Sequence, residues 1–136
     1  MYNWSMAYIA RRTILAADDE RSNLAVLNGI LSPEYTVLTA KTGGEALSRA
    51  RTDSPDLILL DIILPDMNGF DVLLELKTDF ETRDIPVIIV SGMDGGEDEN
   101  KGLILGAAGY IKKPVACGEL LEKVSEIFTR FTEDGN

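Results

Sequence analysis

The feature that most constrains this chain is an apolar run that holds one carboxylate and ends in a proline, Leu57-Ile58-Leu59-Leu60-Asp61-Ile62-Ile63-Leu64-Pro65. An apolar run of this kind is typical of a strand that is buried on both faces. An ionised carboxylate there is costly unless a cation meets it, so we expect Asp61 to have a chemical role. A second run, Thr13 to Ala17, leads directly into Asp18, Asp19 and Glu20.

Strand-like segments recur at the spacing of strand and helix repeats rather than of hairpins. They are Ile14–Ala17, Tyr35–Thr39, Leu57–Leu60, Val87–Val90 and Gly109–Ile111. Parallel strands need crossover connections, and right-handed crossovers cover both faces of the sheet with helices. We therefore expect a doubly wound α/β fold, with a five-stranded parallel sheet and five helices in three layers, α/β/α.

The segments between these strands carry apolar stripes at helical spacing. The stripes are Leu24, Leu27 and Leu31; then Phe70, Leu73, Leu74 and the aliphatic part of Lys77; and last Leu120, Leu121, Val124, Ile127, Phe128 and Phe131. Thr42-Gly43-Gly44-Glu45 has the spacing of a capping box and predicts the start of another helix, which would turn Ala46, Leu47 and Ala50 inward.

Polar residues follow four of the predicted strands. In a doubly wound sheet a ligand binds beyond the carboxyl ends of the strands, where the strand order reverses. The residues at or just past those ends are Asp18, Asp19, Asp61, Ser91 and Lys113. We expect them to converge on one rim of the sheet.

Three carboxylates about 5 Å apart repel one another by roughly 3 kcal/mol per pair at an effective dielectric of 20, so one of them should bind its proton more tightly. A hard cation relieves this repulsion. With oxygen ligands only, the preferred ion is Mg²⁺ or Mn²⁺. A carboxylate beside such an ion can attack phosphorus and form an aspartyl phosphate, and Asp61 is the best-placed nucleophile. Ser91 and Lys113 could bind the transferred group.

Amino-acid composition limits the partners, the metal sites and the cellular location that we expect for this chain. The formal net charge of −10 argues against a nucleic-acid partner, which would need clustered Lys and Arg. With one cysteine and no histidine, an internal disulfide and a structural zinc site are not expected. No apolar stretch approaches the ~18 residues that span a bilayer, and residues 1–12 do not resemble a secretory signal. We expect a cytoplasmic protein that binds no membrane.

Taken together, these motifs resemble the receiver domain of two-component response regulators, the CheY-like family. The resemblance runs from about Thr13 to Phe131 and rests on Asp18-Asp19, Asp61 with Pro65 and Gly69, Val90-Ser91-Gly92, Gly106-Ala107-Ala108-Gly109-Tyr110 and Lys113-Pro114. It implies the strand order 2-1-3-4-5. It also implies that Asp61 takes a phosphoryl group from a phosphohistidine of a sensor histidine kinase or phosphotransfer protein. Such a receiver catalyses its own phosphorylation and dephosphorylation and is not a turnover enzyme.

The resemblance also assigns roles to individual residues. Asp18, Asp19 and Asp61 would bind Mg²⁺ with help from the backbone carbonyl of Ile63. Lys113 would pair with the phosphoryl group, and the Lys113-Pro114 peptide bond would be cis. Ser91 and Tyr110 would form the switch.

Phosphorylation is expected to draw Ser91 inward and to let Tyr110 turn in from the surface. This would repack the face made by the fourth helix, the fifth strand and the last helix, which would control a partner or an output domain absent from this chain. The glycine-rich, acidic segment Gly92–Gly102 is expected to be mobile before phosphorylation and ordered afterwards. A homodimer is left open.

Two apolar residues would flank the acyl phosphate, Ile63 and Met93. Polar residues at such positions can help water attack, so apolar ones should shield the phosphorylated form. We therefore expect it to live longer than in an Ile63→Asn variant.

Several structural alternatives stand beside these roles. Asp18 and Asp19 could cap the first helix, Ser91 could make a local backbone bond, and Tyr110 could be a packed aromatic. Strand alternation and the adjacent proline favour Lys113 over Lys112 as the site cation. The alternative function is a phosphorylation-independent protein-interaction module on the same fold.

The expected organisation is one receiver domain with short ends. We assign 1–12 to an N-terminal extension, 13–131 to the receiver domain, and 132–136 to a tail or the start of a linker.

Overall fold

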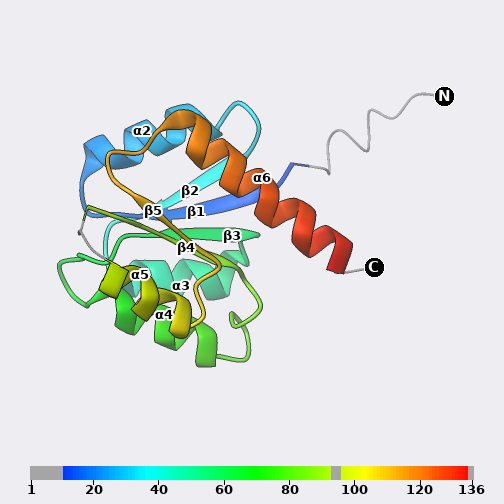
Figure 1. The fold of residues 1–136 in the computed structure, drawn as a ribbon. Coiled ribbons are helices and arrows are strands. Elements are labelled where there is room, and N and C mark those ends of the chain that lie inside the picture. The colour runs from blue at the N-terminus through cyan, green and yellow to red at the C-terminus, as the bar shows by residue number, and fades with distance from the viewer. Residues whose placement is uncertain (1–10, 93–95, 135–136) are drawn as a thin grey trace.

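Five parallel strands form one sheet in the order β2-β1-β3-β4-β5, in a computed structural model that describes residues 11–92 and 96–134, with side chains as far as residue 130 (Figure 1). The strands are β1 (Thr13–Ala17), β2 (Thr36–Ala40), β3 (Leu57–Leu60), β4 (Val87–Ser91) and β5 (Gly109–Lys112). The predicted strand order is confirmed, and each strand lies within one residue of its expected bounds.

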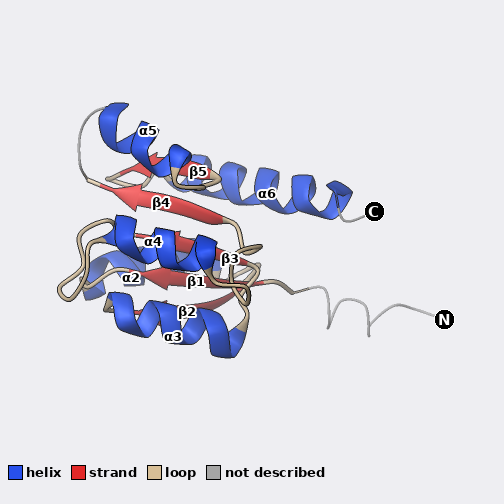
Figure 2. Cartoon of the chain, turned by 90° about the horizontal axis from the view of Figure 1, so that it is seen from below, coloured by secondary structure: helices blue, strands red, loops and turns tan. Residues whose placement is uncertain are grey.

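Helices cover both faces of this sheet. They are α2 (Arg21–Leu31), α3 (Gly43–Asp53), α4 (Gly69–Thr78), α5 (Gly96–Ile104) and α6 (Cys117–Asp134). Helices α2 and α6 lie on one face, and α3, α4 and α5 lie on the other (Figures 1 and 2). The described part of the chain therefore has the predicted three layers.

Each face of the sheet has its own core because side chains alternate along the strands. In β1, Leu15 and Ala17 face the cluster under α3 and α4, whereas Ile14 and Ala16 face the cluster under α2 and α6. All four residues of β3 are buried. The strand that precedes Asp61 is thus covered on both sides, as its composition predicts.

Helix α3 begins at the predicted cap, although only half of the expected box forms. The Glu45 backbone N–H donates to Thr42 Oγ1 at 3.0 Å. Glu45 Oε1 accepts from the backbone N–H of Lys41 at 2.7 Å, and not from that of Thr42. The Glu45 side chain therefore binds the residue before the cap, while the Thr42 side chain binds the backbone of Glu45. These two hydrogen bonds together fix the start of the helix.

One residue of the predicted stripe on α4 is misplaced. Phe70 and Leu73 are buried, but Leu74 is 46% exposed. Leu74 lies about 100° around the helix from Leu73, which places it at the edge of the buried face.

Part of the segment expected to be mobile is helical. Within Gly92–Gly102, residues from Gly96 onward belong to α5, and Met93 lies outside the described residues. The carboxylates of Glu97, Asp98 and Glu99 lie in the first turn of α5, where they interact favourably with the helix dipole. The helix also packs tightly on β4, because a Cβ at Gly102 would lie 2.3 Å from Ile89 Cδ1.

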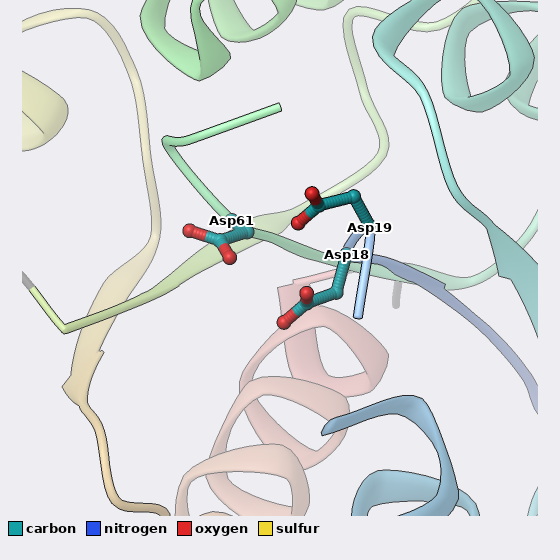
Figure 3. A group of neighbouring side chains, drawn as sticks. All are labelled: Asp18, Asp19 and Asp61. Carbon is teal, nitrogen blue, oxygen red and sulfur yellow. The ribbon is translucent and has the colours of Figure 1, made fainter. Parts of the chain in front are cut away.

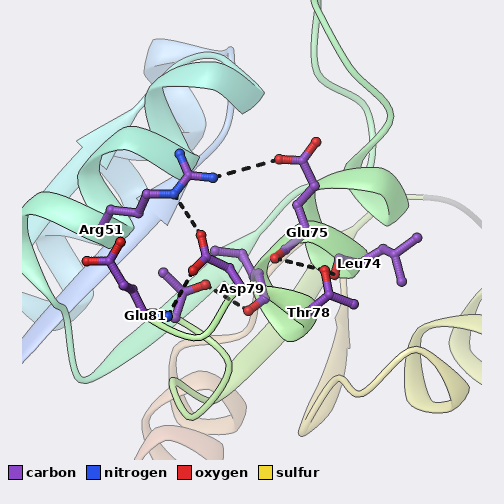
Figure 4. Close-up of polar contacts among 8 residues, drawn as sticks. Arg51, Leu74, Glu75, Thr78, Asp79 and Glu81 are labelled. Atoms are coloured by element: carbon purple, nitrogen blue, oxygen red, sulfur yellow. Dashed lines mark hydrogen bonds and ion pairs between the residues drawn. The ribbon is translucent and has the colours of Figure 1, made fainter.

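Exposed ion pairs join α3 and α4 at the amino end of the sheet (Figure 4). Arg51 Nε donates to Asp79 Oδ2 at 2.8 Å, and the same guanidinium lies 3.9 Å from the Glu75 carboxylate. Asp79 also accepts from the backbone N–H of Glu81 at 2.8 Å. Each charge here faces an opposite charge at the surface.

The last two residues of the expected N-terminal extension contact the domain, and Met1 to Ala10 lie outside the described residues. Arg11 donates to the backbone carbonyls of Ser32 and Tyr35, which lie between α2 and β2. The Arg12 guanidinium lies 4.7 Å from the ring centroid of Phe128 on α6. The helix α6 continues past Phe131 to Asp134.

Candidate functional site

The carboxyl ends of the strands bring Asp18, Asp61 and Lys113 together at one edge of the sheet. Asp18 and Asp61 follow the neighbouring strands β1 and β3, and Lys113 follows β5, which lies beyond β4. The sheet itself fixes two of them. The Asp61 backbone N–H donates to the Ala17 carbonyl at 3.0 Å, and the Asp18 N–H donates to the Ala40 carbonyl at 3.0 Å. The rim predicted from strand spacing therefore forms where the parallel register places it.

The three carboxylates form one cluster (Figure 3), and one oxygen from each lies within 4.8 Å of those from the others. Asp18 and Asp61 are 2% and 7% exposed, while Asp19 is exposed. The Asp18 side chain accepts from the backbone N–H of Glu20 at 2.9 Å, and no side-chain cap bond starts α2. The buried aspartate thus shapes the turn after β1 and does not cap the helix.

The Lys113 ammonium lies between the two buried carboxylates. Its Nζ donates to Asp18 Oδ2 at 2.7 Å and to Asp61 Oδ2 at 2.8 Å. Lys112, its neighbour on β5, is exposed. Alternation along the strand thus brings Lys113, and not Lys112, to the carboxylates.

Burial sets the electrostatics of this cluster. It raises the pKa of Asp61 above its usual value, with a smaller contribution from the charge of Asp18, while the hydrogen bond from Lys113 opposes the shift. Burial alone would lower the pKa of Lys113, but the hydrogen bonds to Asp18 and Asp61 raise it overall. The sequence predicts one tighter-binding proton from repulsion, whereas the main cause is removal of Asp61 from water.

The donor set fits a hard divalent cation. Three carboxylates whose oxygens lie this close together are the ligands that Mg²⁺ and Mn²⁺ prefer, and the group includes neither His nor Cys. Two of the six carboxylate oxygens pair with Lys113, and the exposed carboxylate of Asp19 faces solvent at the same rim. The three carboxylates are therefore close enough together to bind one ion through the oxygens that do not pair with Lys113.

A polar cavity of about 380 Å³ opens onto this cluster. Its lining includes Asp19, Asp61 and Lys113 together with Ile63 and Gly92. The Ile63 side chain is 62% exposed at this opening, and its backbone N–H donates to Asp61 Oδ1 at 3.1 Å. An apolar side chain thus stands beside the buried carboxylate, as the sequence predicts.

Sequence reasoning missed two lining residues, Glu20 and Asn23. Both lie at the start of α2, and Asn23 also lines an adjoining cavity of about 270 Å³ with Val26, Pro114 and Val115. Glu20 directly follows Asp19, and Asn23 lies about one helical turn later. This position is the signal that could have identified them, since the turn after β1 faces the rim.

The remaining predicted residues lie on β4 and β5. Ser91 ends β4, is fully buried, and its backbone carbonyl accepts from the Lys113 N–H at 2.8 Å. Tyr110 is half-buried and packs against the core cluster under α3 and α4, and its role in a switch stays a prediction. The Lys113-Pro114 peptide bond is cis.

Comparisons with known proteins agree with this geometry. Residues 14–125 match the sequence model of the response regulator receiver domain. The chain is 42% identical over 119 residues to the response regulator PleD of Caulobacter vibrioides, a match that covers 87% of this chain and 26% of PleD. It is 37% identical to protein PilH of Pseudomonas aeruginosa over 84% of this chain and 95% of PilH.

A solved structure shows the same architecture. The CheY-like response regulator receiver domain protein of Methanospirillum hungatei superimposes with a TM-score of 0.82 at 34% identity, over 90% of this chain and 98% of that one.

In the residues that the structure describes, no helix is long and apolar enough to cross a bilayer.

Proposed function

The chain belongs to the response regulator receiver domain family, and from this premise we propose that Asp61 is its phosphoryl acceptor. The observation that carries the proposal is the placement of one buried carboxylate, Asp61, 2.8 Å from the Lys113 ammonium and beside two further carboxylates. A receiver domain is a signalling module, and receivers act with histidine kinases or phosphotransfer proteins. The residue roles below are proposals for this chain.

In the proposed reaction an Asp61 carboxylate oxygen attacks the phosphorus of a phosphohistidine. A phosphorus–oxygen bond forms, the phosphorus–nitrogen bond breaks, and its electron pair stays on the imidazole nitrogen. Lys113 can turn from the Asp61 carboxylate to a phosphoryl oxygen, because its ammonium already lies within hydrogen-bond distance of the attacking group. The buried hydroxyl of Ser91, at the end of the adjacent strand, is proposed to bind another phosphoryl oxygen.

Asp18, Asp19 and Asp61 would hold Mg²⁺, or Mn²⁺ in its place, with the backbone carbonyl of Ile63. The ion would supply positive charge to the phosphoryl oxygens when bound. The electrostatics of the cluster support this assignment, since three carboxylates face one ammonium.

The adjoining cavity supports a docking position for the phosphodonor. It shares Asn23 and Lys113 with the cavity over Asp61, and Val26 at its edge is 51% exposed. A helical segment that carries the phosphohistidine could rest on Val26 and Val115 while the imidazole reaches Asp61. We propose this surface for the sensor kinase or phosphotransfer protein.

The proposed output surface lies on α5, β5 and α6, the fourth helix, fifth strand and last helix of the sequence prediction. Leu103 and Ile104 on α5 are 45% and 84% exposed. Movement of Ser91 and Tyr110 after phosphorylation would change this face, and a downstream protein or output domain would read the change. Hydrogen exchange of α5 should change when a phosphoryl mimic binds with magnesium, and unchanged exchange would contradict this part.

Acetyl phosphate and magnesium test the central assignment, with intact-mass spectrometry as the measurement. The wild-type chain should gain one phosphoryl group, Asp61→Ala should gain none, and Asp84→Ala, at an exposed aspartate outside the site, should behave as the wild type. A folded wild-type chain that gains no group would instead favour the phosphorylation-independent interaction module.

A further inference from the structure

The loop after Asp61 is closed at its base by backbone contacts. Ile63 and Asn68 form an antiparallel bridge, and the Gly69 N–H donates to the Ile62 carbonyl at 2.6 Å. Gly69 has no space for a side chain, because a Cβ there would lie 2.4 Å from the Asp61 carbonyl oxygen. The start and the end of the loop are thus held against the end of β3.

The tip of the same loop is tied to a different element. Asp66 Oδ1 accepts from the Gly43 N–H at 2.7 Å, and Asp66 Oδ2 accepts from the Gly44 N–H at 2.9 Å. These two N–H groups belong to the first turn of α3 and have no partner within the helix. They hold the pKa of Asp66 below its usual value.

Packing reinforces this contact. A Cβ at Gly43 would lie 2.9 Å from Met67 Sδ and 3.0 Å from Val72 Cγ2. The loop residue Met67 therefore lies directly on the first residue of α3. The glycine permits the close approach that the two bonds to Asp66 require.

The helix start that Asp66 holds is itself tied to the candidate site. The Asp18 N–H donates to the carbonyl of Ala40, the last residue of β2, and α3 begins three residues later. The end of β2 is thus bonded to Asp18, and the start of α3, three residues later, is bonded to the loop that follows Asp61. A carboxylate at the loop tip fixes both parts of the site against one another.

We propose that Asp66 is a positioning residue, which ties the loop to α3 and so holds the Ile63 carbonyl and side chain at the mouth of the Asp61 cavity. This inference rests on the proposed function, because it concerns the metal and the acyl phosphate at that site. It predicts that Asp66 influences the affinity for Mg²⁺ and the lifetime of the acyl phosphate, although Asp66 contacts neither group. Outer residues that orient metal ligands commonly change metal affinity by 10- to 100-fold.

The first test is a Mg²⁺ titration of the full chain, followed by NMR of backbone amides. Asp66→Ala should weaken Mg²⁺ binding by about tenfold, at the low end of that range because it acts through the loop backbone. Asp66→Asn keeps one acceptor oxygen and should fall between Asp66→Ala and the wild type. If Asp66→Ala does not fold, Asp66→Asn decides the outcome, and wild-type affinity in that variant overturns the proposal.

Asp56→Ala is the matched control. Asp56 Oδ2 accepts from the Thr13 backbone N–H at 2.8 Å, so it makes the same type of bond at the opposite end of the sheet. This variant should lose stability and keep the wild-type affinity for Mg²⁺. Equal weakening in Asp56→Ala and Asp66→Ala would mean that general destabilisation is responsible, and it would overturn the proposal.

The second measurement is the decay of the phosphorylated form at saturating Mg²⁺. Asp66→Ala should decay faster than the wild type because Ile63 is no longer held over the acyl phosphate, and an unchanged rate would count against the proposal. A wild-type chain that binds no Mg²⁺ and accepts no phosphoryl group would refute the proposed function itself. If the wild type binds Mg²⁺ and accepts a phosphoryl group, and Asp66→Ala has the same Mg²⁺ affinity and the same decay rate, only the inference about Asp66 is refuted.

Discussion

The two ends of the sheet use the same kinds of charged residue in opposite ways. At the amino end, Arg51 pairs with Asp79 and Glu75 at the surface, where water and salt screen each charge. At the carboxyl end, Lys113 contacts both Asp18 and Asp61, two buried carboxylates, and a third carboxylate lies beside them. The first arrangement braces two helices, whereas the second leaves negative charge that a ligand can use.

The largest expected effect is that of Lys113→Ala at the carboxyl end. Removing this ammonium leaves Asp18 and Asp61 facing each other without a cation. Breaking a buried pair in this way costs about 3 kcal/mol of unfolding free energy, near the low end because the Lys113 side chain is 20% exposed. Chemical denaturation at pH 7 measures the loss, and added Mg²⁺ should restore part of it.

Lys112→Ala is the control for that experiment, because its exposed side chain lies next in the chain and carries the same charge. It should change stability little. A loss as large as that of Lys113→Ala would show that net charge matters more than the position of the ammonium.

The second prediction concerns pH and Asp61→Asn. Because burial raises the pKa of Asp61, the folded protein holds this proton more tightly than the unfolded chain does, from the ordinary value of 3.8 upward. In that window the stability of the wild type falls as pH rises. Asp61→Asn should therefore be more stable than the wild type at pH 7, because the amide has no charge to keep out of water.

The advantage of Asp61→Asn should shrink as pH falls and vanish below about 3.8, the ordinary pKa. Denaturation midpoints measured across this range test it. An advantage that stays constant with pH would show that the ionised carboxylate is not the cause.

Ile63→Asn comes third. A polar side chain at the mouth of the Asp61 cavity can position water for attack on the acyl phosphate, so the phosphorylated form should decay several-fold faster. Leu74→Asn is the matched control, since Leu74 is also an exposed apolar side chain but lies on α4 outside the lining of that cavity. Equal decay rates in wild type and Ile63→Asn would show that the apolar side chain gives no protection.

The smallest effect is expected for Arg51→Ala at the amino end. The variant loses exposed pairs with Asp79 and Glu75, so its melting temperature should fall slightly, and by less at high salt. Phosphoryl acceptance should not change. A loss of stability as large as that of Lys113→Ala would show that the ion pairs at the two ends of the sheet do not differ in the way described.

The fold could be predicted from the sequence because local patterns determine it. Buried apolar runs place the strands to within one residue, and their spacing requires crossovers. The prediction that Leu74 belongs to the buried stripe of α4 is wrong, because periodicity alone does not define where the buried face of a helix ends. The helical start of α5 was missed because its glycines suggest mobility, while its acidic first turn favours a helix.

The candidate site could be predicted only where strand ends determine it. Asp18, Asp61 and Lys113 follow strands, so the parallel register brings them together. Asp66 did not stand out because its partners, Gly43 and Gly44, lie more than 20 positions earlier and meet it only after the helix has packed. The sequence predicts that one of the three carboxylates has a raised pKa, but not which one, because the main cause, burial of Asp61, depends on the packing around the rim.

The bond between Lys113 and Asp18 joins positions 95 apart in the chain. During synthesis, Asp18 and Asp61 are added to the chain before Lys113, and β5, the strand that precedes this lysine, is the last of the five. An unfinished chain therefore has the proposed acceptor, Asp61, but no complete pocket around it. If the proposed function holds, truncated products that end before β5 should not accept a phosphoryl group, because they lack the lysine that pairs with Asp61.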